Sequence, residues 1–110
     1  MRRFANQEAV LSYSNGLNLI ADMPKTDERD RRALSFRLAM GPALLAARGY
    51  ASDEVERNYL EAGRLAEALG DHKAVFTSTR GLWHYVYDRG ELERALGLAK
   101  RLLAVATEGR

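Results

Sequence analysis

Residues 41–60 read GPALLAARGYASDEVERNYL. Leucines and alanines fill the part before Gly49, and a glycine after such a run stops a helix because it adopts left-handed backbone angles without strain. Ser52 then precedes Asp53 and Glu54, and a serine followed by acidic residues is a common helix start. The stretch therefore predicts a helix, a short turn and a second helix.

A second stretch repeats this order at residues 80–99, which read RGLWHYVYDRGELERALGLA. Its turn glycine, Gly90, lies 41 residues after Gly49. A helical pair that recurs at such a spacing is typical of repeat proteins, in which each unit packs against the next. We therefore expect two helix–turn–helix pairs.

Apolar residues recur at helical spacing along nearly the whole chain. They predict five helices, at about Asn6–Asp22, from the cap Thr26 to Gly49, from the cap Ser52 to Gly70, at about Asp71–Arg89 and at Glu91–Thr107. The sequence therefore predicts an all-α fold in a single domain, residues 1–110, with one lone helix before the two pairs.

Three expectations concern the interior. Pro42 lies inside the second helix and cannot donate a hydrogen bond to the carbonyl of Leu38, so we expect a kink there. Trp83 is expected to pack in the core rather than to form a stacking platform with Tyr85 and Tyr87. The first helix is expected to carry one apolar face, which consists of Phe4, Val10, Tyr13, Leu17 and Ile20.

The composition is that of a folded globular domain, with 46% hydrophobic and 29% charged residues. The net charge is only +2, and the arginines that begin the second helix alternate with acidic residues, which argues against nucleic-acid binding. The chain has no cysteine, so disulfides and thiolate metal sites are excluded. No apolar run approaches the roughly 20 residues of a membrane helix. We expect a cytoplasmic protein that binds neither nucleic acid nor membrane.

The fourth helix carries the candidate site. Arg80, His84, Tyr87 and Asp88 lie on one face because they are spaced at three, four and seven residues, and they are the candidate partner-binding residues. A merely solvated face is the competing interpretation. His84 and Asp88 alone are too few ligands for a zinc site, so we expect a surface hydrogen bond between them. No enzyme activity, metal or cofactor is predicted.

The fifth helix is apolar around more of its circumference than one neighbouring helix can bury. An uncovered apolar face at the end of a helical repeat favours association. We therefore expect a homodimer through the end helices, with Leu92, Leu98, Leu102 and Leu103 as the candidate contact residues.

The two helical pairs loosely resemble the tetratricopeptide repeat. Leu82, Trp83 and Val86 precede Gly90 in the second pair, as the pattern of apolar and aromatic residues before a turn glycine requires. Small and apolar residues follow that glycine. The resemblance implies a tetratricopeptide-like helical solenoid.

A closer resemblance extends over nearly the whole chain. The chain resembles the tetratricopeptide-like region that follows the ATPase domain in bacterial adenylate or guanylate cyclase-type regulatory proteins. The segments that carry this likeness are Gly16-Leu17-Asn18-Leu19, Gly41-Pro42-Ala43-Leu44-Leu45, Arg48-Gly49-Tyr50, Glu54-Val55-Glu56-Arg57, Leu69-Gly70-Asp71 and Arg80-Gly81-Leu82-Trp83. It implies a noncatalytic protein-interaction or scaffolding module in a bacterial signalling or regulatory system. The alternative is a regulatory domain that senses a small ligand in a cyclase-associated or transcription-regulating protein.

Overall fold

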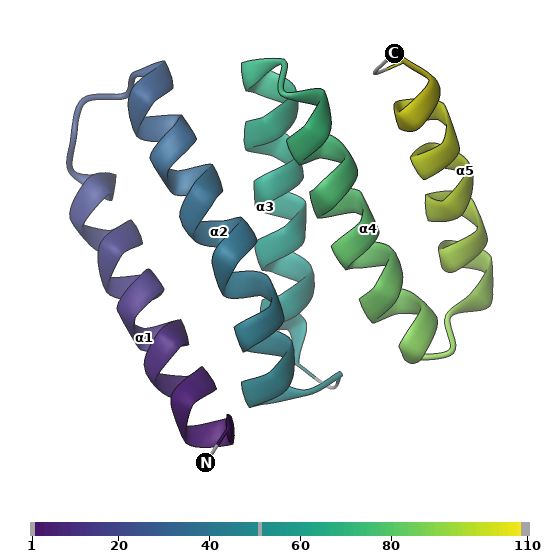
Figure 1. The fold of residues 1–110 in the computed structure, drawn as a ribbon, viewed down its shortest axis with the longest axis horizontal. Coiled ribbons are helices and arrows are strands. Elements are labelled where there is room, and N and C mark those ends of the chain that lie inside the picture. Colours follow the sequence, from purple (N-terminus) through teal and green to yellow (C-terminus); the bar gives the residue numbers. More distant parts are fainter. Residues whose placement is uncertain (1, 51, 109–110) are drawn as a thin grey trace.

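The structure is a computed structural model that describes residues 2–50 and 52–108, with side chains placed from Phe4 onward. Its helices are α1 (Arg2–Ala21), α2 (Asp27–Arg48), α3 (Asp53–Leu69), α4 (His72–Asp88) and α5 (Leu92–Glu108) (Figure 1). The described residues include no strand, and the all-helical prediction is confirmed. Helix α1 begins about a turn before the predicted Asn6, and the other boundaries lie close to the predicted ones.

Capping residues explain where the helices begin. The side chains of Thr26 and Ser52 accept hydrogen bonds from the backbone N–H groups of Arg29 and Glu54, each at 3.2 Å. Asp71 caps α4 in the same way, by accepting a 3.0 Å bond from the backbone of Ala74. These bonds satisfy N–H groups that have no partner within the helix, so the predicted caps Thr26 and Ser52 are confirmed.

Each helix packs against the next one along the chain, and α2 also contacts α4. Figure 1 shows the consequence, because α3 lies behind α2 and α4 rather than in line with them. The molecule is a thin slab of 35 × 35 × 19 Å. This packing of adjacent helices is consistent with a helical repeat.

Two clusters of buried side chains form the core. One takes residues from all five helices and includes Val10, Leu44, Val55, Tyr85 and Ala95. The other lies toward the opposite end of α3 and reaches α5 through Val105. Ion pairs also join α3 to α5, because Arg94 contacts Glu56 at 3.0 Å and Arg101 pairs with Glu67.

Helix α2 continues through Gly41 and Pro42 without interruption. Buried side chains on both sides of the proline, among them Leu34 and Leu44, hold the two halves of the helix against its neighbours. The hydrogen bond that a proline cannot donate therefore does not end the helix.

Two expectations about helix faces were met only in part. Phe4 is 65% exposed, although Val10 and Ile20 of the same predicted face are buried. Trp83 packs against the core but is only partly buried, whereas Tyr85, two residues further along α4, is completely buried. Residues two positions apart on a helix point about 200° apart, so the two rings leave nearly opposite sides of α4 and only Tyr85 lies fully inside.

One side chain fixes the relative positions of α2, α3 and α4. The ring of Tyr59, from α3, lies between Gly41 of α2 and Gly81 of α4. A Cβ atom at either glycine would overlap the far end of the Tyr59 ring. The two glycines therefore let α2 and α4 approach each other over this ring.

We predict that Gly81→Ala lowers the free energy of unfolding by about 1–3 kcal/mol, because the added methyl group overpacks the site. The control is Gly97→Ala in α5, where an added Cβ atom meets no atom within 4 Å. That substitution should raise stability by about 0.5–1 kcal/mol through helix propensity alone. Urea denaturation measures both. A similar gain for both variants would contradict the packing of Tyr59.

Candidate functional site

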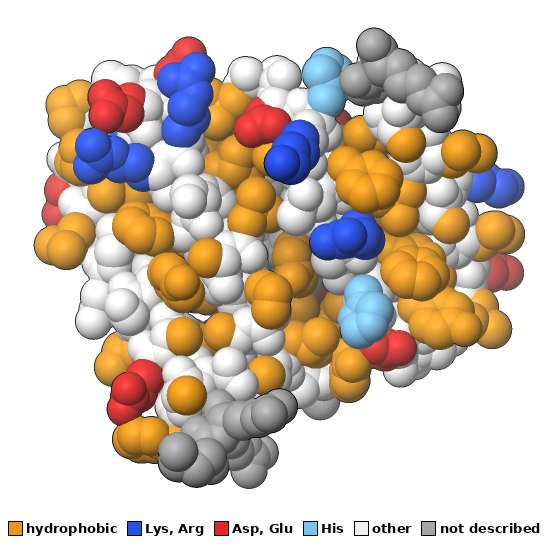
Figure 2. Space-filling view, viewed as in Figure 1, with side chains coloured by type: hydrophobic (Ala, Val, Ile, Leu, Met, Phe, Trp, Pro, Cys, Tyr) orange, Lys and Arg blue, Asp and Glu red, His pale blue; other side chains and the backbone are white. Residues whose placement is uncertain are grey.

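A hollow of about 640 Å³ opens between α2 and α4, directly over Tyr59. Its α2 side consists of apolar residues and the turn residue Tyr50, and its α4 side supplies two basic residues and a tryptophan. The lining residues are Pro42, Leu45, Ala46, Tyr50, Tyr59, Arg80, Gly81, Trp83 and His84. Figure 2 shows this face of the molecule, on which apolar side chains surround scattered basic and histidine side chains.

Tyr59 contributes to the floor of this hollow. Burial raises the pKa of its hydroxyl above the usual value, and the positive charge of Arg80 acts in the opposite direction. The phenol is therefore neutral at physiological pH. Among the described residues, no hydrogen bond occupies this hydroxyl, so it is able to donate one to a bound group.

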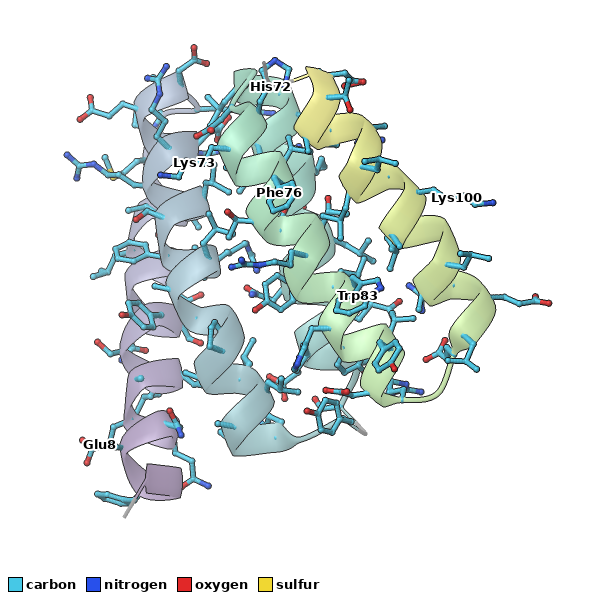
Figure 3. All side chains as sticks on the ribbon, turned by 45° about the vertical axis from the view of Figure 1, so that its right-hand side comes forward. Glu8, His72, Lys73, Phe76, Trp83 and Lys100 are labelled. Atoms are coloured by element: carbon cyan, nitrogen blue, oxygen red, sulfur yellow. The ribbon has the colours of Figure 1, made fainter. Side chains whose placement is uncertain are left out.

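Arg80 brings positive charge to the rim. It forms no ion pair with the described residues, whereas Arg48 and Arg89, at the turns that end α2 and α4, are both paired. Trp83 lies next to it on α4 and stacks on Tyr87 with ring centroids 5.1 Å apart and an interplanar angle of 28°. Figure 3 shows Phe76 and Trp83 along the same helix. The α4 side of the hollow thus combines an uncompensated cation with an aromatic surface.

The four predicted partner-binding residues divide between two places. Arg80 and His84 line the hollow. Asp88 lies at its end, where it contacts His84 Nδ1 at 3.4 Å. Tyr87 is 52% exposed and reaches the hollow only through its stack on Trp83.

Sequence reasoning missed the α2 side of the hollow. Pro42, Leu45 and Ala46 look like the apolar face of an ordinary core helix, yet Pro42 and Ala46 are exposed. Pro42 itself was the available signal. A proline within a helix leaves the carbonyl four residues back without its usual N–H donor, and this costs least where that side of the helix borders open space and water can reach the carbonyl.

Hydrogen bonds tie the turn between α2 and α3 to the end of α4. The hydroxyl of Tyr50 donates to Asp88 Oδ2 at 2.8 Å, and this bond raises the pKa of Tyr50 above its usual value. Arg89 donates to the carbonyl of Tyr50 and to the hydroxyl of Tyr85, each at 2.8 Å. Tyr85 in turn donates to the carbonyl of Ser52 at 2.8 Å. This network holds Tyr50 at the edge of the hollow.

A second hollow, of about 500 Å³, lies among α3, α4 and α5. Its arginines are already neutralised, because Arg64 pairs with Glu61 at 2.5 Å and Arg101 pairs with Glu67. Because these arginines are already paired, they are less available to bind an anionic ligand than the unpaired Arg80 in the first hollow.

The structure also shows how exposed the four predicted contact leucines of α5 are. Leu92 and Leu103 are 66% and 71% exposed, whereas Leu98 and Leu102 are partly buried, and Leu98 packs against the core. Only two of the four proposed contact leucines are thus fully available to a partner.

Within residues 2–50 and 52–108, no three His, Cys, Asp or Glu side chains are grouped so as to hold a metal ion. None of the described helices combines the length and apolar character needed to cross a membrane.

Comparison with known proteins adds no family to this description. No protein-family model, curated protein or solved structure matches the chain. The resemblance to the tetratricopeptide-like region of cyclase-type regulatory proteins therefore stays a prediction.

We predict that Tyr85→Phe lowers the free energy of unfolding by about 1–2 kcal/mol. The substitution leaves the carbonyl of Ser52 and the guanidinium of Arg89 without the hydroxyl they share. Tyr87→Phe, which alters an exposed ring on the same helix, should change stability by less than about 0.5 kcal/mol. Equal effects in chemical denaturation would show that the turn is not held by Tyr85.

Proposed function

We propose that this chain is a noncatalytic, tetratricopeptide-like module that binds a segment of a protein partner in the hollow between α2 and α4. Stacked helix pairs commonly present such an extended surface. Here the first helix of each pair, α2 and α4, contacts the other and leaves the groove between them. The solenoid architecture, the cytoplasmic location and the role in bacterial signalling are parts of the same proposal, and the last of these rests on the sequence resemblance.

The observation that carries the proposal is the unpaired Arg80 within an aromatic and aliphatic surface. Tryptophan, tyrosine and arginine are the residue types that contribute most to protein interfaces. Trp83, Tyr50 and Arg80 gather here from α4 and the α2–α3 turn. Arginine in such a setting favours a carboxylate, because its planar guanidinium can donate two parallel hydrogen bonds.

The chemistry of the preferred segment follows from this lining. An apolar or aromatic side chain would lie against Leu45 and Trp83, and a neighbouring Asp or Glu would pair with Arg80. The hydroxyl of Tyr59 would donate to a backbone carbonyl or carboxylate that reaches the floor.

The sensor hypothesis remains the second candidate because the volume of the hollow lies within the roughly 300–1,000 Å³ that small-molecule sites occupy. Its ligand would have the same chemistry, a small aromatic carboxylate. Tight retention of such a ligand needs a more enclosed cavity with several converging polar groups, whereas this hollow is wide and mostly apolar. We therefore favour the protein segment.

We predict that selection from a random peptide library enriches segments in which an aromatic or large aliphatic residue lies next to Asp or Glu. Arg80→Glu should weaken binding of those peptides at least about tenfold, since it replaces an attractive charge by a repulsive one. Trp83→Ala should weaken it by a similar factor.

The control is Arg57→Glu, which makes the same charge change at an exposed arginine of α3 that lines a different, smaller hollow. It should leave affinity unchanged within about twofold, and Arg80→Glu and Arg57→Glu should both keep the wild-type melting temperature within a few degrees. Peptides without acidic residues, or equal loss in Arg57→Glu, would contradict the proposal. Stabilisation by small aromatic carboxylates with no peptide selected would favour the sensor instead.

A further inference from the structure

We propose that α5 pairs antiparallel with α5 of a second copy of this chain. The solvent side of α5 carries an apolar stripe whose members are spaced four, three, four and three residues apart, namely Leu92, Leu96, Ala99, Leu103 and Ala106. Its three leucines are 66%, 58% and 71% exposed. This spacing is the heptad pattern with which two helices bury a shared seam.

The stripe is not needed by the chain's own fold. Helix α5 contacts α4 through its opposite side, where Ala95 and Val105 are buried and Leu98 packs against the core. The apolar residues of α5 thus form two groups. Those on the inner side are buried against the rest of the chain, whereas those of the outer stripe remain exposed. Leu98 belongs to the inner side, so a dimer cannot use it without disturbing the fold.

The charged residues beside the stripe favour a second copy of this chain as the partner, and they favour an antiparallel orientation of that copy. Glu93 follows Leu92 and Lys100 follows Ala99, so both flank the stripe on the same edge. Both are exposed, and neither forms an ion pair with the described residues. In Figure 3, Lys100 points away from the rest of the molecule. A second copy placed antiparallel would bring Glu93 to the partner's Lys100 and Lys100 to the partner's Glu93, which satisfies all four charges. A parallel copy would place the two edges on opposite sides of the seam, so that Glu93 and Lys100 would face the partner's Ala95 and Leu102 and all four charges would stay unpaired.

The same charges fix the register. With Leu103 packed against the partner's Leu92, and Leu96 against the partner's Ala99, the oppositely charged residues are offset by about two positions, or roughly 3 Å along the helix. A shift by one heptad would leave Leu92 uncovered and place Lys100 near the partner's Lys100. The favoured register therefore buries the most leucine and also matches the charges.

The exposed apolar residues of α1 offer no comparable seam. Phe4, Leu11 and Leu19 are widely spaced, and the exposed polar residues Asn15 and Asn18 lie between the two leucines. A contact of α5 with α1 of another copy would also be head-to-tail, and such contacts extend into open assemblies unless they close into a ring. Pairing of α5 with itself closes after two copies.

Sedimentation equilibrium tests the contact. Because three leucines per copy over about 17 Å make a small interface, we expect a monomer–dimer equilibrium with a dissociation constant on the order of tens of micromolar. Leu103→Glu should give a monomer at about 200 μM with unchanged helicity. Leu11→Glu, the same change at a 62% exposed leucine of α1, should dimerise like the wild type. A wild-type monomer at about 200 μM, or an equal effect of both substitutions, would overturn the proposal.

Charge exchange tests the direction. Glu93→Lys and Lys100→Glu should each weaken the dimer about tenfold, because each places like charges opposite one another at two sites. The double variant Glu93→Lys/Lys100→Glu should return to the wild-type dissociation constant, since it restores both opposite pairs with their signs reversed. Single variants that dimerise as well as the wild type, or a double variant that stays weak, would exclude the antiparallel pairing.

Discussion

The ring of Tyr59, enclosed between Gly41 and Gly81, is the contact on which the arrangement of the middle three helices depends. A side chain from α3 passes between α2 and α4, and only glycine on both sides lets the two helices approach over it. Close packing makes such a position intolerant of even one added methyl group. The contact between α2 and α4, which are not neighbours in the chain, is the direct result.

The same Tyr59 contact forms the floor of the hollow between α2 and α4. Because Tyr59 fills the space between α2 and α4 from behind, the groove in front of it is shallow, wide and lined by the outer faces of both helices. The network around Tyr50, Asp88 and Arg89 then fixes the end of the groove. A rigid surface of this kind suits recognition, since little side-chain freedom is lost when a partner binds.

The helices were predictable because local signals specify them. Thr26 and Ser52 cap their helices as expected, and Gly49, Gly70 and Gly90 adopt positive φ at the turns. The identity of the groove was harder to predict, because it depends on which side of each helix meets which neighbour. Arg80 and His84 were found from their shared face, but the roles of Pro42, Tyr50 and Tyr59 arise from contacts between distant parts of the chain. Trp83 packs against the core as expected, but its place at the rim of the hollow was not predicted, since its apolar character is compatible with either position.

Nuclear magnetic resonance can observe the Tyr59 contact directly. If the ring lies between the two glycines, its protons should show nuclear Overhauser effects to the α-protons of both Gly41 and Gly81. The ring current should also shift these α-protons away from those of Gly97, which has no side chain nearby. Effects to both glycines are the result that we predict. Effects to only one glycine, or to neither, would contradict the packing that positions the groove.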